Sequence, residues 1–117
     1  MRGGLIFKIV TRDQWAVACN EGVFKGAPVD LADGYIHFSA PEQVKETAAK
    51  HFAGQDDLLL VGCAAALLDG LKWEVSRGGA EFPHLYGTFA PNEVLWVQPL
   101  PLGEDGAHIF PQEAGEI

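Results

Sequence analysis

Runs of hydrophobic residues along the chain predict five β-strands. Residues 5–10 and 58–64 are almost continuously apolar, and the second run suits a central strand that is covered on both faces. Residues 71–76 alternate between apolar and polar side chains, which is typical of a half-buried strand. Residues 35–39 form a short strand, and residues 94–98 form a further strand that the following prolines either end or place at an edge.

Helix starts are marked twice by a capping-box pattern, in which a hydroxyl residue is followed three positions later by Glu or Gln. The pattern occurs at Thr11 and again at Ser39. It predicts one helix over about residues 12–20 and a second over about residues 41–52. In both cases a glycine shortly beyond the last apolar position provides a natural end.

Two segments, 21–33 and 76–87, show no hydrophobic period and are predicted to be irregular loops. The last part of the chain adds a short strand over residues 107–110. Helices separate only the early strands, so the order of elements favours an α+β fold over a doubly wound sheet. The whole chain, 1–117, is expected to form a single domain, with a core of about 5–100 and an acidic, glycine-rich tail.

Composition narrows the function classes. The 117 residues carry 16 acidic and 8 basic side chains, so the net charge is −8. This charge argues against nonspecific nucleic-acid binding and against docking on an anionic membrane. No apolar run is long enough to span a bilayer and no signal peptide is recognisable, which predicts a cytoplasmic protein.

Cysteine and histidine spacing gives little sign of metal chemistry. Cys19 falls in the first predicted helix and Cys63 in an apolar strand, so both are expected to be buried free thiols. The four histidines are scattered along the chain, and we therefore expect no metal site.

The strand before the second helix places three polar side chains on one face. Alternation puts Tyr35, His37 and Ser39 on that face, and Ile36 and Phe38 on the other. A histidine and a serine beside a helix start suit the binding of a ribose or an anion. The same residues also fit a capping serine and a half-buried histidine whose hydrogen bonds are satisfied within the protein.

Further candidates follow the strand over residues 71–76. Glu74 lies on its polar face, where a carboxylate could hydrogen-bond a ribose or act as a base. Arg77 comes directly after this strand and could bind a phosphate. A solvent-facing glutamate and an ordinary surface arginine are the alternatives.

An aromatic string follows in the second irregular segment. His84 and Tyr86 are two residues apart, so in an extended segment they point the same way and suit stacking on a flat ring. The alternative is that Phe82 and Tyr86 fill the core while Pro83 fixes a turn.

Taken together, these strings resemble the bacterial DUF952 family. The resemblance rests on Gly34-Tyr35-Ile36-His37-Phe38-Ser39, Leu71-Lys72-Trp73-Glu74 and Phe82-Pro83-His84-Leu85-Tyr86-Gly87. That family has no established biochemical role. Its fold is grouped with the ADP-ribosyltransferases, so the resemblance implies an ADP-ribosylation-like fold, in which a mixed, split and curved sheet with two main helices surrounds an NAD cleft.

The resemblance also implies roles for individual residues. His37 would contact the ribose and the nicotinamide amide of NAD, and Tyr86 would support the nicotinamide ring. Glu74, or alternatively Glu81, would stabilise the oxocarbenium-like transition state. The resulting hypothesis is a small domain that binds NAD or a related nucleotide as its substrate and transfers ADP-ribose. The alternative is a non-catalytic module that binds a ligand or a protein partner in the same cleft.

Overall fold

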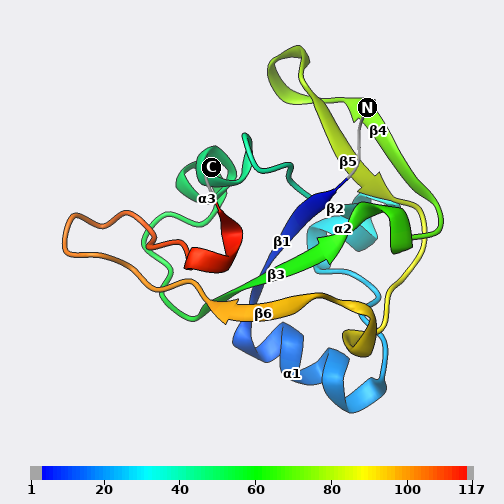
Figure 1. Ribbon diagram of the computed structural model, residues 1–117, viewed down its shortest axis with the longest axis horizontal. Helices are drawn as coiled ribbons and strands as arrows, with labels where there is room; N and C mark the ends of the chain where they lie inside the picture. The colour runs from blue at the N-terminus through cyan, green and yellow to red at the C-terminus, as the bar shows by residue number, and fades with distance from the viewer. Residues whose placement is uncertain (1–3, 116–117) are drawn as a thin grey trace.

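The computed structural model describes residues 4–115, including every side chain in that range except that of Arg77. Three strands form the first sheet: β1 (Leu5–Thr11), β3 (Leu58–Ala64) and β6 (Trp96–Pro99). β3 lies in the middle and pairs antiparallel with both neighbours (Figure 1). The continuous apolar run therefore forms a central strand, as predicted.

Gly62 on β3 makes room for the indole ring of Trp96 on β6. It pairs with Trp96, and a Cβ atom at position 62 would lie 2.5 Å from the indole ring. The strand over 94–98 is displaced from its predicted bounds, because residues 91–93 form a short turn and the ladder begins only at Trp96.

The second sheet consists of β2 (Ile36–His37), β5 (Glu81–Leu85) and β4 (Leu71–Val75), again with antiparallel neighbours. β5 lies in the middle, so the prediction that residues 76–87 are irregular is wrong. Pro83 masks the strand in the sequence, because proline seldom occupies a central strand. It is accommodated opposite Trp73, and its carbonyl still accepts a hydrogen bond of 2.9 Å from the amide of Phe38.

The α+β class is confirmed, but the expected mixed sheet is not found. Among residues 4–115 every pairing between named strands is antiparallel. The two sheets meet where the chain leaves β2: Phe7 and Ser39 exchange two backbone hydrogen bonds of 2.8 Å. We call this pair of hydrogen bonds the seam.

The first helix, α1 (Arg12–Glu21), matches its prediction. Thr11 and Gln14 form the capping box, each side chain bonding the backbone amide of the other residue, and Gly22 ends the helix in a left-handed conformation. The expectation for Cys19 is wrong, since this thiol is exposed on the helix surface. Cys63 is buried as expected, and burial raises its pKa to about 12.

The helix after Ser39 begins later than predicted. It is α3 (Val44–His51), and residues 41–43 form turns instead of its first residues. Ser39 is not its cap: its hydroxyl lies 3.0 Å from that of Thr47, and the Gln43 side chain accepts from the amide of Ala40. The capping-box prediction at Ser39 fails because Ser39 already belongs to the seam with β1.

A short helix, α2 (Pro28–Asp33), occupies the segment predicted to be a loop. Pro28 starts it, the Asp30 carboxylate accepts a hydrogen bond from the amide of Ala27, and Gly34 ends it with a φ of 89°. Six residues are too few to show a hydrophobic period, which explains why the sequence pattern missed it.

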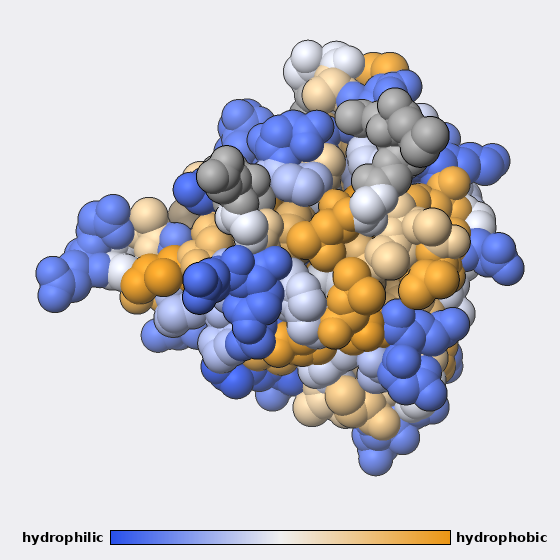
Figure 2. All heavy atoms as spheres, in the orientation of Figure 1, coloured by the Kyte–Doolittle hydropathy of each residue, from blue (hydrophilic) through white to orange (hydrophobic). Residues whose placement is uncertain are grey.

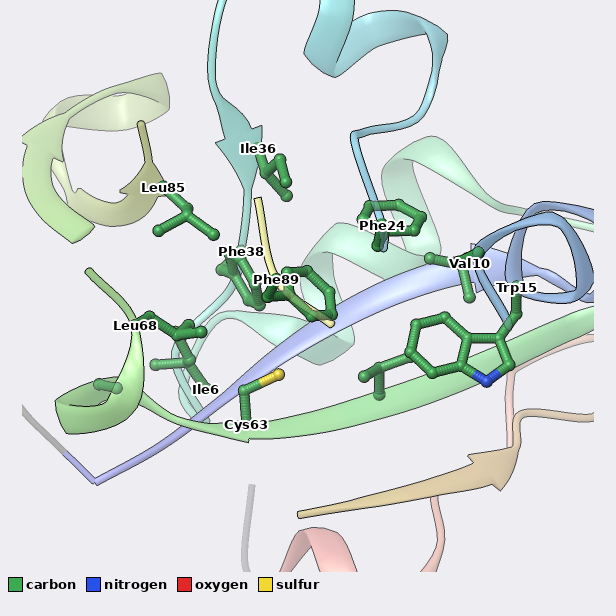
Figure 3. Close-up of a cluster of buried hydrophobic side chains, with 13 residues drawn as sticks. Ile6, Val10, Trp15, Phe24, Ile36, Phe38, Cys63, Leu68, Leu85 and Phe89 are labelled. Carbon is green, nitrogen blue, oxygen red and sulfur yellow. The ribbon is translucent and has the colours of Figure 1, made fainter. Parts of the chain in front are cut away.

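Hydrophobic side chains fill both faces of the first sheet. Figure 3 shows the larger cluster, in which Phe24, Phe38 and Phe89 lie between β1 and the second sheet. The smaller cluster lies under α3 and includes Phe7, Val44 and Leu60. The remaining regular elements are the short 3₁₀ turns η1 (Ala65–Leu67), η2 (Arg77–Gly79), η3 (Pro91–Glu93) and η4 (Gln112–Ala114).

The C-terminal segment projects from the first sheet (Figure 1) and its tip is hydrophilic (Figure 2). Residues 107–110 do not form the predicted strand; a single bridge joins Leu102 to His108. None of the helices in the described range has the length and apolar character that crossing a bilayer requires.

Candidate functional site

A pocket of about 610 Å³ opens beside the seam, and both Phe7 and Ser39 line it. Its wall draws on β1, α2, β2, α3 and β5, so segments distant in the sequence contribute to one cavity. Three of the predicted ligand-binding residues, His37, Ser39 and His84, line it together.

His37 is held between two carboxylates. Its Nδ1 lies 2.7 Å from an Asp30 oxygen and its Nε2 lies 2.9 Å from an Asp33 oxygen. Asp30 also accepts a 3.0 Å hydrogen bond from the His37 backbone amide. Because ionised carboxylates only accept hydrogen bonds, a proton on either ring nitrogen of His37 has an acceptor in one of these two acids.

Behind His37, Asp30 forms a buried ion pair with Lys8. The Lys8 ammonium lies 2.9 and 3.0 Å from the two carboxylate oxygens, and the side chains are 6% and 1% exposed. Burial alone would raise the pKa of Asp30, but hydrogen bonds from His37 and the charge of Lys8 outweigh it and lower that pKa to about 2. Asp30 is therefore ionised at neutral pH, and it anchors both α2 and β2.

A stack of rings continues from His37 toward the surface. The ring of Tyr35 lies 4.6 Å from that of His37, 4.2 Å from that of His84 and 5.2 Å from that of Tyr86. Burial raises the pKa of Tyr35, and the charges of Asp33 and Glu74 raise it further. The wall therefore offers stacked aromatic rings with two carboxylates close to Tyr35, which suits a flat, electron-poor ring.

Glu74 lies on the far side of this stack. One carboxylate oxygen accepts hydrogen bonds of 2.8 Å from His84 Nδ1 and from the Tyr86 hydroxyl. These two bonds, in that order of importance, lower the pKa of Glu74. Tyr86 is 43% exposed, and Lys72 lies 5.0 Å above its ring. His84 lines the pocket and Glu74 contacts His84, so Glu74 and Tyr86 lie behind His84 as seen from the pocket.

The comparisons with known proteins decide the family. A family model described as "Protein of unknown function (DUF952)" matches residues 9–97. The chain belongs to the DUF952 family. It is similar to protein CC0527 from Caulobacter crescentus: the X-ray structure of that protein is 49% identical over 94% of this chain and 97% of that chain, with a TM-score of 0.88. The solution NMR structure of the same protein is 52% identical, covers 88% and 90%, and has a TM-score of 0.80.

The family resemblance expected from the sequence is thus confirmed, together with the α+β fold. No curated protein matches the chain. The family description names no ligand and no reaction, so the function of this DUF952 chain has to be argued from the pocket.

Of the predicted site residues that the structure describes, Glu74, Tyr86 and Glu81 are not part of the pocket wall. Glu81, the alternative catalytic residue, begins β5 with an exposed side chain and is not part of the pocket wall within residues 4–115. The side chain of Arg77 lies outside the described residues. In the same range, no three metal-binding side chains gather at one point.

Sequence reasoning missed Lys8 and Asp30, and it named Tyr35 without a role. One signal was present: Lys8 is the only charged residue in the apolar run of β1, at an inward position between Ile6 and Val10. A buried lysine requires an acidic partner. That partner came from the segment interpreted as a loop, and the sequence alone does not indicate which acid it is.

Proposed function

We propose that this chain binds NAD or a related nucleotide in the pocket beside the seam and transfers ADP-ribose from it. The observation that carries the proposal is the convergence of His37, Ser39 and His84 on one cavity with an aromatic wall. Two sheets that diverge from the seam also agree with the split sheet of an ADP-ribosyltransferase-like fold, which is part of the same proposal.

The cavity suits a nucleotide in size and in chemistry. Its volume of about 610 Å³ falls within the range of roughly 300–1,000 Å³ that is usual for small-molecule sites. Tyr35 offers a ring for stacking, and Ser39 and Thr47 offer hydroxyls. The aromatic face of Tyr35, with the carboxylates of Asp33 and Glu74 near it, suits a cationic ring such as nicotinamide in its oxidised form.

Transfer would break the bond between nicotinamide and ribose. Positive charge then develops on the ribose, and a nearby carboxylate lowers the energy of that state. Glu74 is the candidate, because its lowered pKa keeps it negative at neutral pH. In this proposal His37 positions the ribose, and the stack of Tyr35, His84 and Tyr86 supports the ring.

The binding step is tested by calorimetric titration of the chain with NAD, ADP-ribose and nicotinamide. Wild type is expected to bind NAD, and His37→Ala to bind it at least about tenfold more weakly, a loss of roughly 1.4 kcal/mol. His108→Ala is the matched control, because His108 is a histidine outside this pocket, bonded to the carbonyl of Gln55. Absence of NAD binding at millimolar concentration would overturn the proposal.

A second candidate, a non-catalytic binding module, is favoured by one observation. Within the described residues Glu74 is not part of the pocket wall, and its Oε1 is already engaged by His84 and Tyr86. Chromatography of nicotinamide separates the two candidates. Release by wild type and none by Glu74→Gln, with equal NAD affinity, supports transfer; binding without release by wild type supports the module.

A further inference from the structure

His84 differs from His37 in what its ring nitrogens contact. Its Nδ1 lies 2.8 Å from Glu74 Oε1, and the side chain is only 4% exposed. Because an ionised carboxylate accepts, Nδ1 is the donor in this contact. No described residue hydrogen-bonds Nε2, and His84 itself lines the pocket. A neutral His84 held in this way has its proton on Nδ1 and a lone pair on Nε2.

His37 has no ring nitrogen left open in this way. Its Nδ1 lies 2.7 Å from an Asp30 oxygen and its Nε2 lies 2.9 Å from an Asp33 oxygen. The pocket therefore contains one histidine arranged as a hydrogen-bond donor to acids and one arranged to accept a proton. Glu74 sets the second arrangement, and the Tyr86 hydroxyl holds the same carboxylate oxygen in place at 2.8 Å.

We propose that His84 Nε2 is the general base of this site and that Glu74 is its positioning residue. The inference rests on the proposed function and adds the group that activates the acceptor. An acceptor hydroxyl, or water, forms a bond from its oxygen to the anomeric carbon of the ribose. The bond from that carbon to nicotinamide breaks, and its electron pair leaves with nicotinamide. The hydroxyl proton passes to Nε2, and the resulting imidazolium is stabilised by the Glu74 carboxylate.

The Glu74 carboxylate thus acts on the substrate indirectly, through His84. This explains how Glu74 contributes without lining the cavity: its charge reaches the reacting atoms through the imidazole of His84. The arrangement has the logic of a carboxylate–histidine pair in acyl transfer, where the acid fixes the tautomer and stabilises the imidazolium.

The first test needs no ligand. Long-range ¹H–¹⁵N spectra of the histidine rings report which nitrogen carries the proton. Wild type at mildly alkaline pH is expected to show His84 protonated on Nδ1 alone, and Glu74→Ala is expected to show a mixture of both tautomers. If wild-type His84 is instead protonated on Nε2, the assignment of His84 as base and Glu74 as its positioning residue is overturned, whichever ligand the protein binds.

The second test uses nicotinamide release from NAD. His84→Gln is expected to lower kcat by about 10²-fold or more while KM changes little, because the amide keeps the polar contact but cannot take the proton. His108→Gln is the control and should release nicotinamide at the wild-type rate. Glu74→Gln should lower kcat without weakening NAD binding, because the amide no longer holds the His84 proton on Nδ1 or stabilises the imidazolium.

The failures of the two proposals are distinguishable. If wild type does not bind NAD, the proposed function and the transfer step fail together. If wild type binds NAD and releases nicotinamide, and His84→Gln does so equally well, only the base assignment is overturned. A His84 ring in Glu74→Ala with the same tautomer as in wild type would remove Glu74 from its positioning role.

Discussion

The two sheets of this domain are stabilised in different ways. The first sheet has apolar side chains on both faces, with Leu58, Leu60 and Val61 fully buried on β3. The second sheet carries His37 and His84 on its pocket face, and charged groups hold each of them. Burial of apolar area dominates in the first sheet, and directional contacts between ionisable groups dominate in the second.

The contrast between the two sheets indicates which part of a small domain is suited to carry reactive groups. Apolar packing does not depend on protonation and tolerates substitutions that conserve side-chain volume. Ionisable contacts depend on exact partners and on protonation, which makes the second sheet both more fragile and more useful for a reaction. Lys8 is the exception that joins them, because it comes from β1 and bonds Asp30 beneath β2.

The largest expected effect comes from breaking that junction. Asp30→Asn leaves the Lys8 ammonium buried without its counter-charge and should cost about 3–5 kcal/mol of unfolding free energy, measured by urea denaturation. Asp33→Asn is the matched control on the same helix; its side chain is 46% exposed, so it should cost less than about 1 kcal/mol. Equal costs for the two variants would show that the buried pair does not stabilise the second sheet.

In the first sheet, Leu60→Ala should cost roughly 2–5 kcal/mol by the same measurement, because it empties a fully buried site under α3. Leu31→Ala, at a side chain that is 66% exposed, should stay within about 0.5 kcal/mol of wild type. Unlike the Asp30 effect, the Leu60 effect should be the same at neutral and acidic pH. A pH-dependent cost would break the contrast between the sheets.

Acid should weaken the second sheet selectively. Asp30 has a pKa of about 2 in the fold against an ordinary value of 3.8. A lowered carboxylate pKa stabilises the fold above pH 3.8, and that contribution is lost as the pH falls toward 2. The loss amounts to about 2.5 kcal/mol, and it should appear as the difference between the pH–stability curves of wild type and Asp30→Asn. Parallel curves would contradict the assignment.

The smallest effect concerns the hydroxyl of Ser39. Ser39→Ala should cost about 1 kcal/mol through its lost contact with Thr47. A helix cap would cost about as much, so the partner must be identified by a double-mutant cycle. Ser39 should couple with Thr47→Val by roughly 0.5–1 kcal/mol and not with Glu42→Ala. Coupling of Ser39 to Glu42 instead would support the capping box predicted from the sequence.

The sequence predicts the first sheet and α1 well because each relies on a local rule. The apolar run of β3 is long and uninterrupted, and the capping box at Thr11 involves neighbours only three residues apart. β5 escapes prediction because Pro83 and His84 break its apolar pattern, although their burial in the sheet is decided by β2 and β4. The capping box at Ser39 is overridden by a pairing with β1 that no local pattern contains.

The candidate site is predictable in part for the same reason. His37 and His84 are visible as polar residues in otherwise apolar strings, and they do share a pocket. Their partners are not visible, since Asp30, Asp33 and Glu74 are ordinary acids among sixteen until the chain is folded. The sequence therefore indicates which histidines take part in the site. Which acid contacts each histidine can be known only from the tertiary structure.

The seam gives the domain a built-in reporter. Each of Phe7 and Ser39 donates one amide and accepts one, so a momentary parting of the sheets releases both amide hydrogens together. Deuterium uptake at these two positions measures how often the sheets separate. Both residues also border the cavity. A bound molecule that spans the sheets would slow deuterium uptake there while leaving the ladder between β1 and β3 unchanged, so occupancy can be followed before the ligand has been identified.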